Sequence, residues 1–530
     1  MKCDILIVGG GTGGVGAALA ACRLGRTVIM TEPTDWIGGQ FTQQAVPPDE
    51  HHYIESCGRT ASYQRFRTGV RKYYQDQGLL TESARYTKPS VYLLNPGNGV
   101  VSRLCHEPRV GLAVMESMLA PYKQSGLLKI LLEHKPVAAD VCGDKVRHIT
   151  VQSILSGDEA TIECRYVLDA TETGELLPLT GTEYVTGSES QDDTGEPHAS
   201  ATRRPLNMQA VTSCFAMDYL PDEDHTIDKP EMYDFWQTYQ VPFGKKPLLS
   251  WHDIDPVTLK DRTLPLFGYQ EGDTFNRGRW NFRRLIDKSN FRPGTFASDI
   301  TLVNWFMNDY FLGPVFEIPS EQALENEFKA KQLSLSSLYW MQTQAPRPDG
   351  GQGYPGLRLR KDVVGTEDGL AKHLYIRESR RIMAELTITE QHIAAECRPG
   401  QSLGELFDDS VGVGEYRIDL HPTTEGDNFL DIASLPFRIP LGALLPVRME
   451  NLLPACKNIG TTHITNGVYR LHPTEWTIGE AAGLLAAYCL QHDILPRQVR
   501  KDKSRLEDFQ KLLRDSGFEL EWPDLDWTIF

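Results

Sequence analysis

Positive charge and long apolar runs are both scarce in this sequence. Its 530 residues include 54 lysines and arginines against 71 acidic residues, so the formal net charge is −17. Nucleic acids and anionic membrane surfaces attract basic proteins, so we expect neither as a partner. A helix that crosses a bilayer needs about 20 consecutive apolar residues, and no stretch of the sequence reaches that length. We therefore expect no membrane span.

Paired cysteines are also absent. None of the ten cysteines forms a C-x-x-C pair or lies near a histidine at zinc-site spacing. Scattered cysteines are typical of buried thiols in a reducing compartment, and the chain enters a strand-like segment at once, without a signal peptide. We therefore expect a cytoplasmic protein with no metal site. A redox role for Cys57 or Cys456, which lie in glycine-containing segments, is the alternative.

The most informative motif follows the first apolar run, residues 5–8. Gly9, Gly11 and Gly14 occupy the glycine positions of a G-x-G-x-x-G turn before an alanine-rich helix. Such glycines let backbone amides approach a pyrophosphate, whose charge faces the helix N-terminus. Glu32 ends a second apolar run, where an acidic side chain accepts hydrogen bonds from a ribose hydroxyl. This order predicts a dinucleotide-binding unit, with a structural glycine turn as the alternative.

Hydrophobic periodicity predicts further elements along the chain. The predicted helices cover residues 107–124, 320–344, 376–390 and 473–491, and the predicted strands cover residues 128–133, 145–153, 160–169 and 451–456.

The composition changes twice along the chain. Residues 187–206 are rich in Ser, Asp, Gly, Pro and Thr and predict a loop at a domain boundary, and aromatic residues are dense from there to about residue 430. We expect an α/β protein with a discontinuous Rossmann-like domain and an inserted, mixed α+β domain. The predicted bounds are 1–190 with 431–500 for the first, 191–430 for the second, and 501–530 for a C-terminal helix and tail.

Several blocks together resemble a known family. They are residues 8–14 (VGGGTGG), 37–39 (IGG), 168–174 (LDATETG), 438–446, 451–460 and 461–483. In this combination they are similar to FAD-dependent oxidoreductases with a glutathione-reductase-type FAD-binding fold. The resemblance implies FAD as the cofactor and leaves the substrate open. Glu172 departs from the pattern, because many relatives have glycine at that position.

The resemblance also implies which residues contact FAD. It places Gly9, Gly11, Gly13 and Gly14 at the pyrophosphate, Glu32 at the adenosine ribose, Gly39 and Gln40 near the pyrophosphate and ribityl chain, Ala170 and Thr171 along the nucleotide, Asn458 to Thr462 at the ribityl chain, and the helix that contains Gly479 at the isoalloxazine.

Oxidation of an alcohol or amine needs a group that takes the substrate proton, and histidine is the usual choice. His463, His472 and His421 are the candidates, each with a structural, hydrogen-bonded role as the alternative. Arg470 is a candidate for the pyrimidine edge of the flavin or, alternatively, for a surface ion pair. Glu475 lies in the first turn of the helix predicted for residues 473–491, and it is expected to cap that helix. The pair His51-His52 is expected to be a polar loop, with covalent flavin attachment or metal binding as the alternative.

A second glycine fingerprint for NAD(P)H is missing, so we expect electrons to leave to oxygen, a quinone or a protein. The predicted function is hydride transfer from a C–H next to O or N of a small polar, sugar-like or cyclic substrate to flavin N5. Asn304, Asn308, Asp309, Arg377 and Arg380 are candidates for substrate contacts. A flavin-dependent monooxygenase or halogenase is one alternative, and a non-catalytic FAD-binding electron carrier is another. The oligomeric state stays open.

Overall fold

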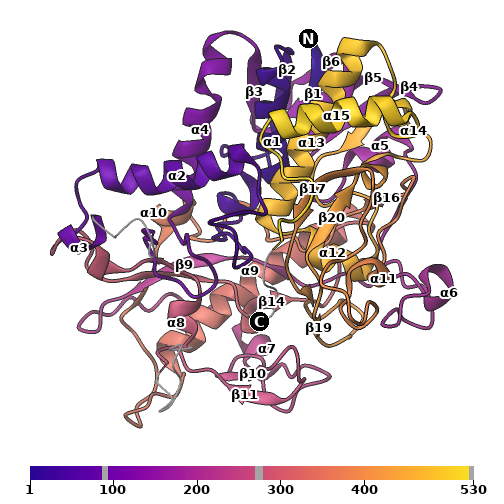
Figure 1. Ribbon diagram of the computed structural model, residues 1–530. Coiled ribbons are helices and arrows are strands. Elements are labelled where there is room, and N and C mark those ends of the chain that lie inside the picture. The colour runs from indigo at the N-terminus through magenta and orange to yellow at the C-terminus, as the bar shows by residue number, and fades with distance from the viewer. Residues whose placement is uncertain (86–92, 269–277, 525–530) are drawn as a thin grey trace.

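The computed structural model describes residues 1–85, 93–268 and 278–524, and its largest sheet, which has a parallel core, lies at the top of the view in Figure 1. The strand order is β3-β2-β1-β6-β5-β4, and β21 also pairs with β6. The parallel strands are β1 (Lys2–Val8), β2 (Val28–Glu32), β3 (Leu128–Leu132), β6 (Glu159–Asp169) and β21 (Leu452–Pro454). The antiparallel strands are β4 (His134–Cys142) and β5 (Lys145–Ser153).

The predicted Rossmann-like, discontinuous architecture is confirmed by this sheet. Helix α1 (Thr12–Arg23) connects β1 to β2, which lie side by side in parallel. The late strand β21 enters the same sheet, with Leu453 opposite Leu168 of β6. The early and late parts of the chain therefore share one sheet. The exact domain bounds stay a prediction, and residues 525–530 of the expected tail lie outside the described residues.

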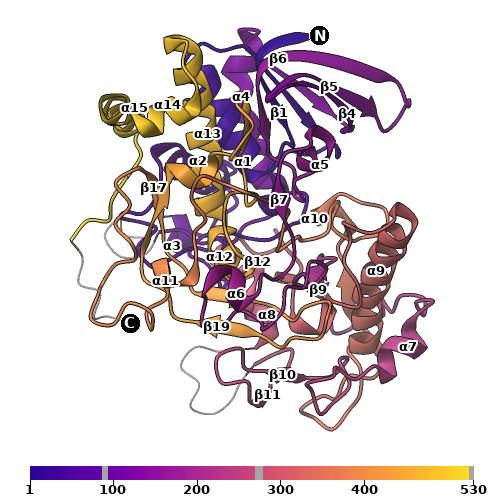
Figure 2. The ribbon, with the colours of Figure 1, turned by 90° about the vertical axis from the view of Figure 1, so that its right-hand side faces the viewer.

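Two helices from opposite ends of the chain pack against each other beside this sheet. Figures 1 and 2 show α1 next to α13 (His472–His492). Glycines make the approach so close that a Cβ added to Gly479 would lie 2.0 Å from the carbonyl oxygen of Gly13, and one added to Gly483 would lie 2.5 Å from that of Ala17. Only glycine fits at such a helix contact.

A second, antiparallel sheet lies in the middle of the chain. Its order is β12 (Arg284–Ile286), β13 (Ile300–Val303), β9 (Phe215–Tyr219) and β15 (Leu357–Leu359), and the long helix α9 (Ser320–Thr343) contacts it. Most of the aromatic side chains of this region form its core, among them Trp236, Trp251, Trp280 and Trp340. Their density therefore reflects packing, and it does not by itself mark a substrate pocket.

Other elements connect or cover these sheets. They are α2 (Ala61–Asp76), α4 (Pro108–Gln124), α5 (Leu176–Thr180), α7 (Tyr233–Thr238), α12 (His463–Tyr469), α14 (Pro496–Lys501) and α15 (Lys503–Asp515), and the strand pairs β8 (Val211–Thr212) with β14 (Asp309–Tyr310), β17 (Ser410–Gly414) with β20 (Phe437–Pro440), and β18 (Ile418–Leu420) with β19 (Leu430–Ile432). None of the described helices is long and apolar enough to cross a membrane.

The predicted helices at 107–124, 320–344 and 473–491 are confirmed by α4, α9 and α13. The helix predicted for 376–390 is wrong. That segment is extended and contains only the short strand β16 (Arg381–Ile382), before α11 (Glu390–Ile393) begins. Most of its charged side chains are buried, and they bond to separate parts of the chain, such as Arg377 to Ala210 and Arg381 to Thr461. These tertiary contacts outweigh the local helical pattern.

Candidate functional site

The glycine turn after β1 closes on the neighbouring backbone. A Cβ on Gly9 would lie 2.2 Å from the Ala170 carbonyl oxygen, one on Gly14 would lie 2.1 Å from that of Gly9, and one on Gly13 would lie 1.8 Å from that of Ala455. Gly11 is the N-cap residue of α1 and offers no side-chain cap. The first-turn amides of a helix have no intrahelical acceptor and carry partial positive charge, so this turn is suited to a phosphate.

A small cavity of about 20 Å³ adjoins the turn. Of the residues predicted to contact the nucleotide, it is lined by Gly9, Gly11, Glu32, Ala170 and Thr171. The buried Glu32 carboxylate accepts hydrogen bonds from the backbone N–H of Gly10 at 3.0 Å and of Thr34 at 2.8 Å. Burial raises the pKa of Glu32 to about 7. These five residues therefore share one wall, and their contacts with the nucleotide stay predictions.

A buried polar cluster extends from this cavity to the start of α13. The Gln40 side chain donates to the Arg470 carbonyl oxygen at 2.9 Å and to the Glu475 carboxylate. Lys457 pairs with Glu172 and lies 3.5 Å from Glu475. Burial opposes the charge of Lys457, but the two carboxylates hold its pKa above the ordinary value. Glu475 therefore faces Lys457, and the expected capping role is wrong, because α13 has no side-chain cap.

The other predicted cofactor contacts lie around this cluster. A Cβ on Gly39 would lie 2.7 Å from the backbone nitrogen of Thr12, so Gly39 also requires a bare backbone. Asn458 donates to the Asp169 carbonyl oxygen at 3.0 Å. Thr462 caps α12 through the N–H of Thr465. Gly479 packs on Gly13 and serves the contact between α1 and α13.

Arg470 is buried, with 3% of its surface exposed, so a surface ion pair is excluded for it. Its guanidinium donates to the Tyr375 hydroxyl at 3.2 Å and to the Asp419 carbonyl oxygen at 3.1 Å. Its Nε atom has no hydrogen-bond partner among the described residues, and the same is true of two other buried atoms nearby in sequence, Thr461 Oγ1 and Asn466 Oδ1. Buried polar atoms normally have partners, so this segment is suited to a polar ligand.

The structure assigns His472 a structural role. Its Nδ1 accepts the backbone N–H of Asp49 at 3.1 Å, and its Nε2 donates to the Val46 carbonyl oxygen at 3.3 Å. Burial lowers the pKa of His472 to about 4, so the ring is neutral. Both ring nitrogens of His472 are therefore bonded to backbone, which favours the structural alternative over the role of a base.

His421 and His463 each pair with a buried carboxylate. His421 Nδ1 lies 2.5 Å from Asp309, which also binds Arg377 at 3.0 Å. His463 Nδ1 lies 2.9 Å from Glu378. Gln209 connects the two pairs, because its backbone N–H donates to Glu378 and its side-chain oxygen accepts the backbone N–H of His421.

His463 differs from His421 in lining a cavity of about 250 Å³. Burial opposes the charge of the ring, but Glu378 raises the pKa of His463 above its ordinary value. The other polar residues of the wall are Ser188, Glu189, Glu196, His198, Ser200, Arg204, Thr423, Asp427 and Asn428. We name this space the His463 cavity.

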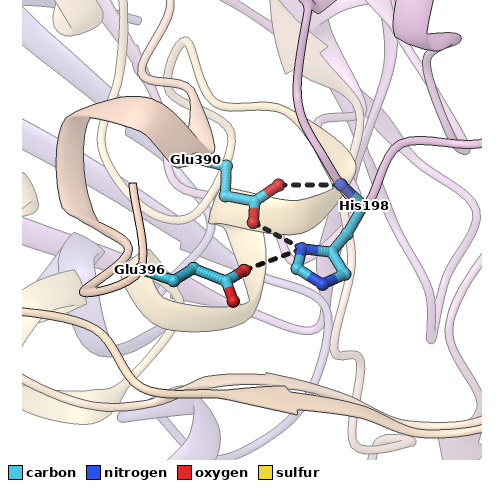
Figure 3. Close-up of side chains that lie close together, drawn as sticks. All are labelled: His198, Glu390 and Glu396. Carbon is cyan, nitrogen blue, oxygen red and sulfur yellow. Dashed lines mark hydrogen bonds and ion pairs between the residues drawn. The ribbon is translucent and has the colours of Figure 1, made fainter. Parts of the chain in front are cut away.

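His198, in the wall of the His463 cavity, meets two carboxylates (Figure 3). Its Nδ1 lies 2.6 Å from Glu390 and 3.3 Å from Glu396, and its backbone N–H also donates to Glu390. The three side chains could offer one ligand atom each to a metal ion, all within 4.8 Å of one another. In this structure the imidazole acts as a hydrogen-bond donor between the two acids.

The cysteines do not support a redox role. All ten are free thiols. Burial raises the pKa of Cys456 well above the ordinary value and also raises that of Cys57, so neither is poised as a thiolate.

His51, of the pair expected to form a polar loop, bonds to the Gly58 carbonyl oxygen, and burial lowers the pKa of His51 to about 4.

A family model described as FAD dependent oxidoreductase matches residues 4–513. The chain belongs to this family. It is accordingly an enzyme, an oxidoreductase whose cofactor is FAD. No curated protein matches the sequence.

Solved structures are similar over part of the chain. The L-proline dehydrogenase from P. horikoshii is 16% identical over 36% of this chain and 24% of its own, with a TM-score of 0.18. The anhydrotetracycline hydroxylase OxyS from Streptomyces rimosus is 14% identical over 42% and 39%, with a TM-score of 0.22. The glycerol-3-phosphate dehydrogenase from Bacillus halodurans, complexed with FAD, is 14% identical over 41% and 40%, with a TM-score of 0.24. This chain spans less than half the length of each.

Proposed function

We propose that the enzyme oxidises a C–H bond next to O or N in a small polar, sugar-like or cyclic substrate, and that the His463 cavity receives this substrate. Bound FAD supplies the hydride acceptor. The observation that supports the proposal best is that His463 lines a polar cavity and is paired with the buried Glu378. The residues that would hold FAD are those of the glycine turn, Glu32 and the 456–462 loop, which ends immediately before His463.

The chemistry of the cavity favours a small, hydroxylated substrate. Its wall combines acceptors, such as Glu189 and Asp427, with the donor Arg204 and several hydroxyl groups. A hydroxyl group both donates and accepts, so it can use such a mixed surface. The volume of about 250 Å³ is below the usual range for pockets that hold drug-sized ligands.

His463 is the proposed proton acceptor. Oxidation of an alcohol or amine releases a proton from O or N, and a base must take it. Glu378 holds Nδ1 of the ring, which leaves Nε2 for the substrate. The carboxylate also strengthens the base, because it stabilises the imidazolium that forms. His421 is the weaker candidate, since it is not part of the cavity wall and its carboxylate partner is shared with Arg377.

The acceptor of the electrons and the location complete the proposal. We propose oxygen, a quinone or another protein as the acceptor, and a cytoplasmic location, as the sequence suggests. The inserted region, residues 191–430, is the proposed substrate domain.

Anaerobic mixing tests the function. The purified, FAD-loaded protein is mixed without oxygen with polyols, sugars, hydroxy acids and amines, and loss of the yellow flavin absorbance is followed. We expect one of these classes to bleach the protein without NAD(P)H. Bleaching by NAD(P)H alone would instead support the monooxygenase alternative, and no bleaching by any compound would support the electron-carrier alternative.

A further inference from the structure

We propose that Lys457 binds the diphosphate of FAD, and that Glu172 occupies the diphosphate position in the FAD-free chain until the cofactor displaces it. Glu172 would then be a built-in competitor for its own cofactor site. The inference rests on FAD being the cofactor, and not on the substrate or on the proton acceptor proposed above.

The first observation is the place of the Glu172 carboxylate. Its Oε1 lies 3.0 Å from the position of a Cβ on Gly11 and 3.0 Å from that of a Cβ on Gly39. These glycines belong to two different loops that meet at the start of α1. The carboxylate therefore lies directly over the glycine turn, at the end of the helix that attracts anions.

The second observation is that Glu172 borders the small cavity beside the glycine turn. It lines this cavity together with Gly9, Gly11 and Glu32. A dinucleotide that places its adenosine ribose beside Glu32 and continues toward α13 would have to pass the Glu172 carboxylate. Two negative phosphates next to an ionised carboxylate repel it, so the side chain must turn away when the diphosphate binds.

The third observation is the buried lysine behind this carboxylate. The Lys457 side chain is fully buried and pairs with Glu172, while a Glu475 carboxylate oxygen lies 3.5 Å from Lys457 Nζ. A buried ammonium group needs a negative partner, and loss of Glu172 would leave only the more distant Glu475. A diphosphate over the glycine turn would restore that partner. The exchange thus keeps Lys457 paired in both states.

Charge count explains why the exchange costs affinity. With Glu172 and Glu475 ionised and Lys457 protonated, the cluster carries one net negative charge, and the incoming diphosphate adds two more. Removing the charge of Glu172 therefore favours the bound state, whereas removing the charge of Lys457 disfavours it. The two substitutions have opposite effects only if the pair acts on the ligand, because a merely structural ion pair would be broken by either one.

Equilibrium binding to the full-length, FAD-stripped chain tests the proposal. The variants are Glu172→Gln, Lys457→Met and the double variant, with Asp218→Asn as a matched control, since Asp218 is a buried carboxylate paired with Arg358 and lines neither of the two cavities described above. We expect the dissociation constant for FAD to fall about fivefold in Glu172→Gln and to rise at least about tenfold in Lys457→Met, corresponding to about 1 and 1.4 kcal/mol. The double variant should bind FAD more tightly than Lys457→Met and more weakly than Glu172→Gln, and the control should match the wild type.

Two further probes separate the diphosphate from the rest of the cofactor. ADP contains adenosine and a diphosphate, so it should show the same opposite shifts as FAD. Adenosine has no phosphate, so its affinity should be equal in all variants. Weaker FAD binding in both single variants, together with a lower melting temperature in both, would overturn the proposal in favour of a structural ion pair. A wild-type chain that binds neither FAD nor ADP would overturn it as well.

Discussion

The contact between α1 and α13 leaves no room for a side chain at Gly479, and the substitution Gly479→Ala tests it. The new methyl carbon would lie 2.0 Å from the carbonyl oxygen of Gly13 and 2.4 Å from its Cα. Real Cβ atoms do not approach backbone atoms below about 3.0 Å, so the helices must separate by about 1 Å. The carbonyl oxygen and Cα of Gly13 cannot move aside by a change of rotamer, because both are backbone atoms.

The size of the effect follows from two opposing contributions. Overpacking a tight contact costs about 1–3 kcal/mol, and here we expect the upper end. Alanine is favoured over glycine in a helix by about 1 kcal/mol, which offsets part of that cost. The net destabilisation is therefore about 1–2 kcal/mol. FAD affinity should fall too, because Gly13 belongs to the turn that faces the diphosphate.

Denaturant unfolding and FAD titration measure the two effects. Gly69→Ala in α2 is the matched control, since its new methyl would meet only the Val114 side chain, at 2.7 Å, which can move. We expect an unchanged or slightly altered midpoint for the control and a clear decrease for Gly479→Ala. A Gly479→Ala protein that is as stable as the wild type, or more stable, would refute the close helix contact.

Two further predictions concern buried charges. Burial raises the pKa of Glu32 in the folded state to about 7 from the ordinary 4.5, so the folded FAD-free chain binds more protons than the unfolded chain and loses stability as the pH rises from 4.5 to 7. Glu32→Gln should flatten this decrease in pH-dependent unfolding, and an unchanged slope would contradict it. Asp309→Asn leaves Arg377 buried with no anionic partner, so we expect a loss of about 3–5 kcal/mol by denaturant unfolding; Asp299→Asn, at a more exposed ion pair with Arg284, should lose less. Equal losses in the two variants would contradict the buried role of Asp309.

The nucleotide half of the site could be predicted from the sequence because its signal is local. The glycine turn, Glu32 and the helix after residue 472 each have a short-range pattern, and the sheet confirms their order. The contact of Gly479 with Gly13 could not be predicted, since it joins residues that are distant in sequence.

The charged pairs around the two cavities could not be predicted from the sequence. The local sequence does not indicate which polar or charged side chains are buried. It therefore does not predict the roles of Glu378, Gln209, Glu189 and Lys457. The segment 376–390 was predicted to be helical for the same reason. Its structure is decided by partners 68 and 80 residues away, Asp309 and Thr461, which periodicity does not reveal. His472 also follows this pattern, since only the fold shows that both its nitrogens bond to backbone.

The most direct test of the proposed chemistry is the rate at which substrate reduces the bound FAD without oxygen, compared between the wild type, His463→Gln and His421→Gln. We predict that His463→Gln retains FAD but slows reduction at least about 100-fold and loses the rise of the rate with pH, while His421→Gln stays within about tenfold of the wild type. A His463→Gln enzyme that is reduced at the wild-type rate, with the wild-type pH profile, would contradict the account.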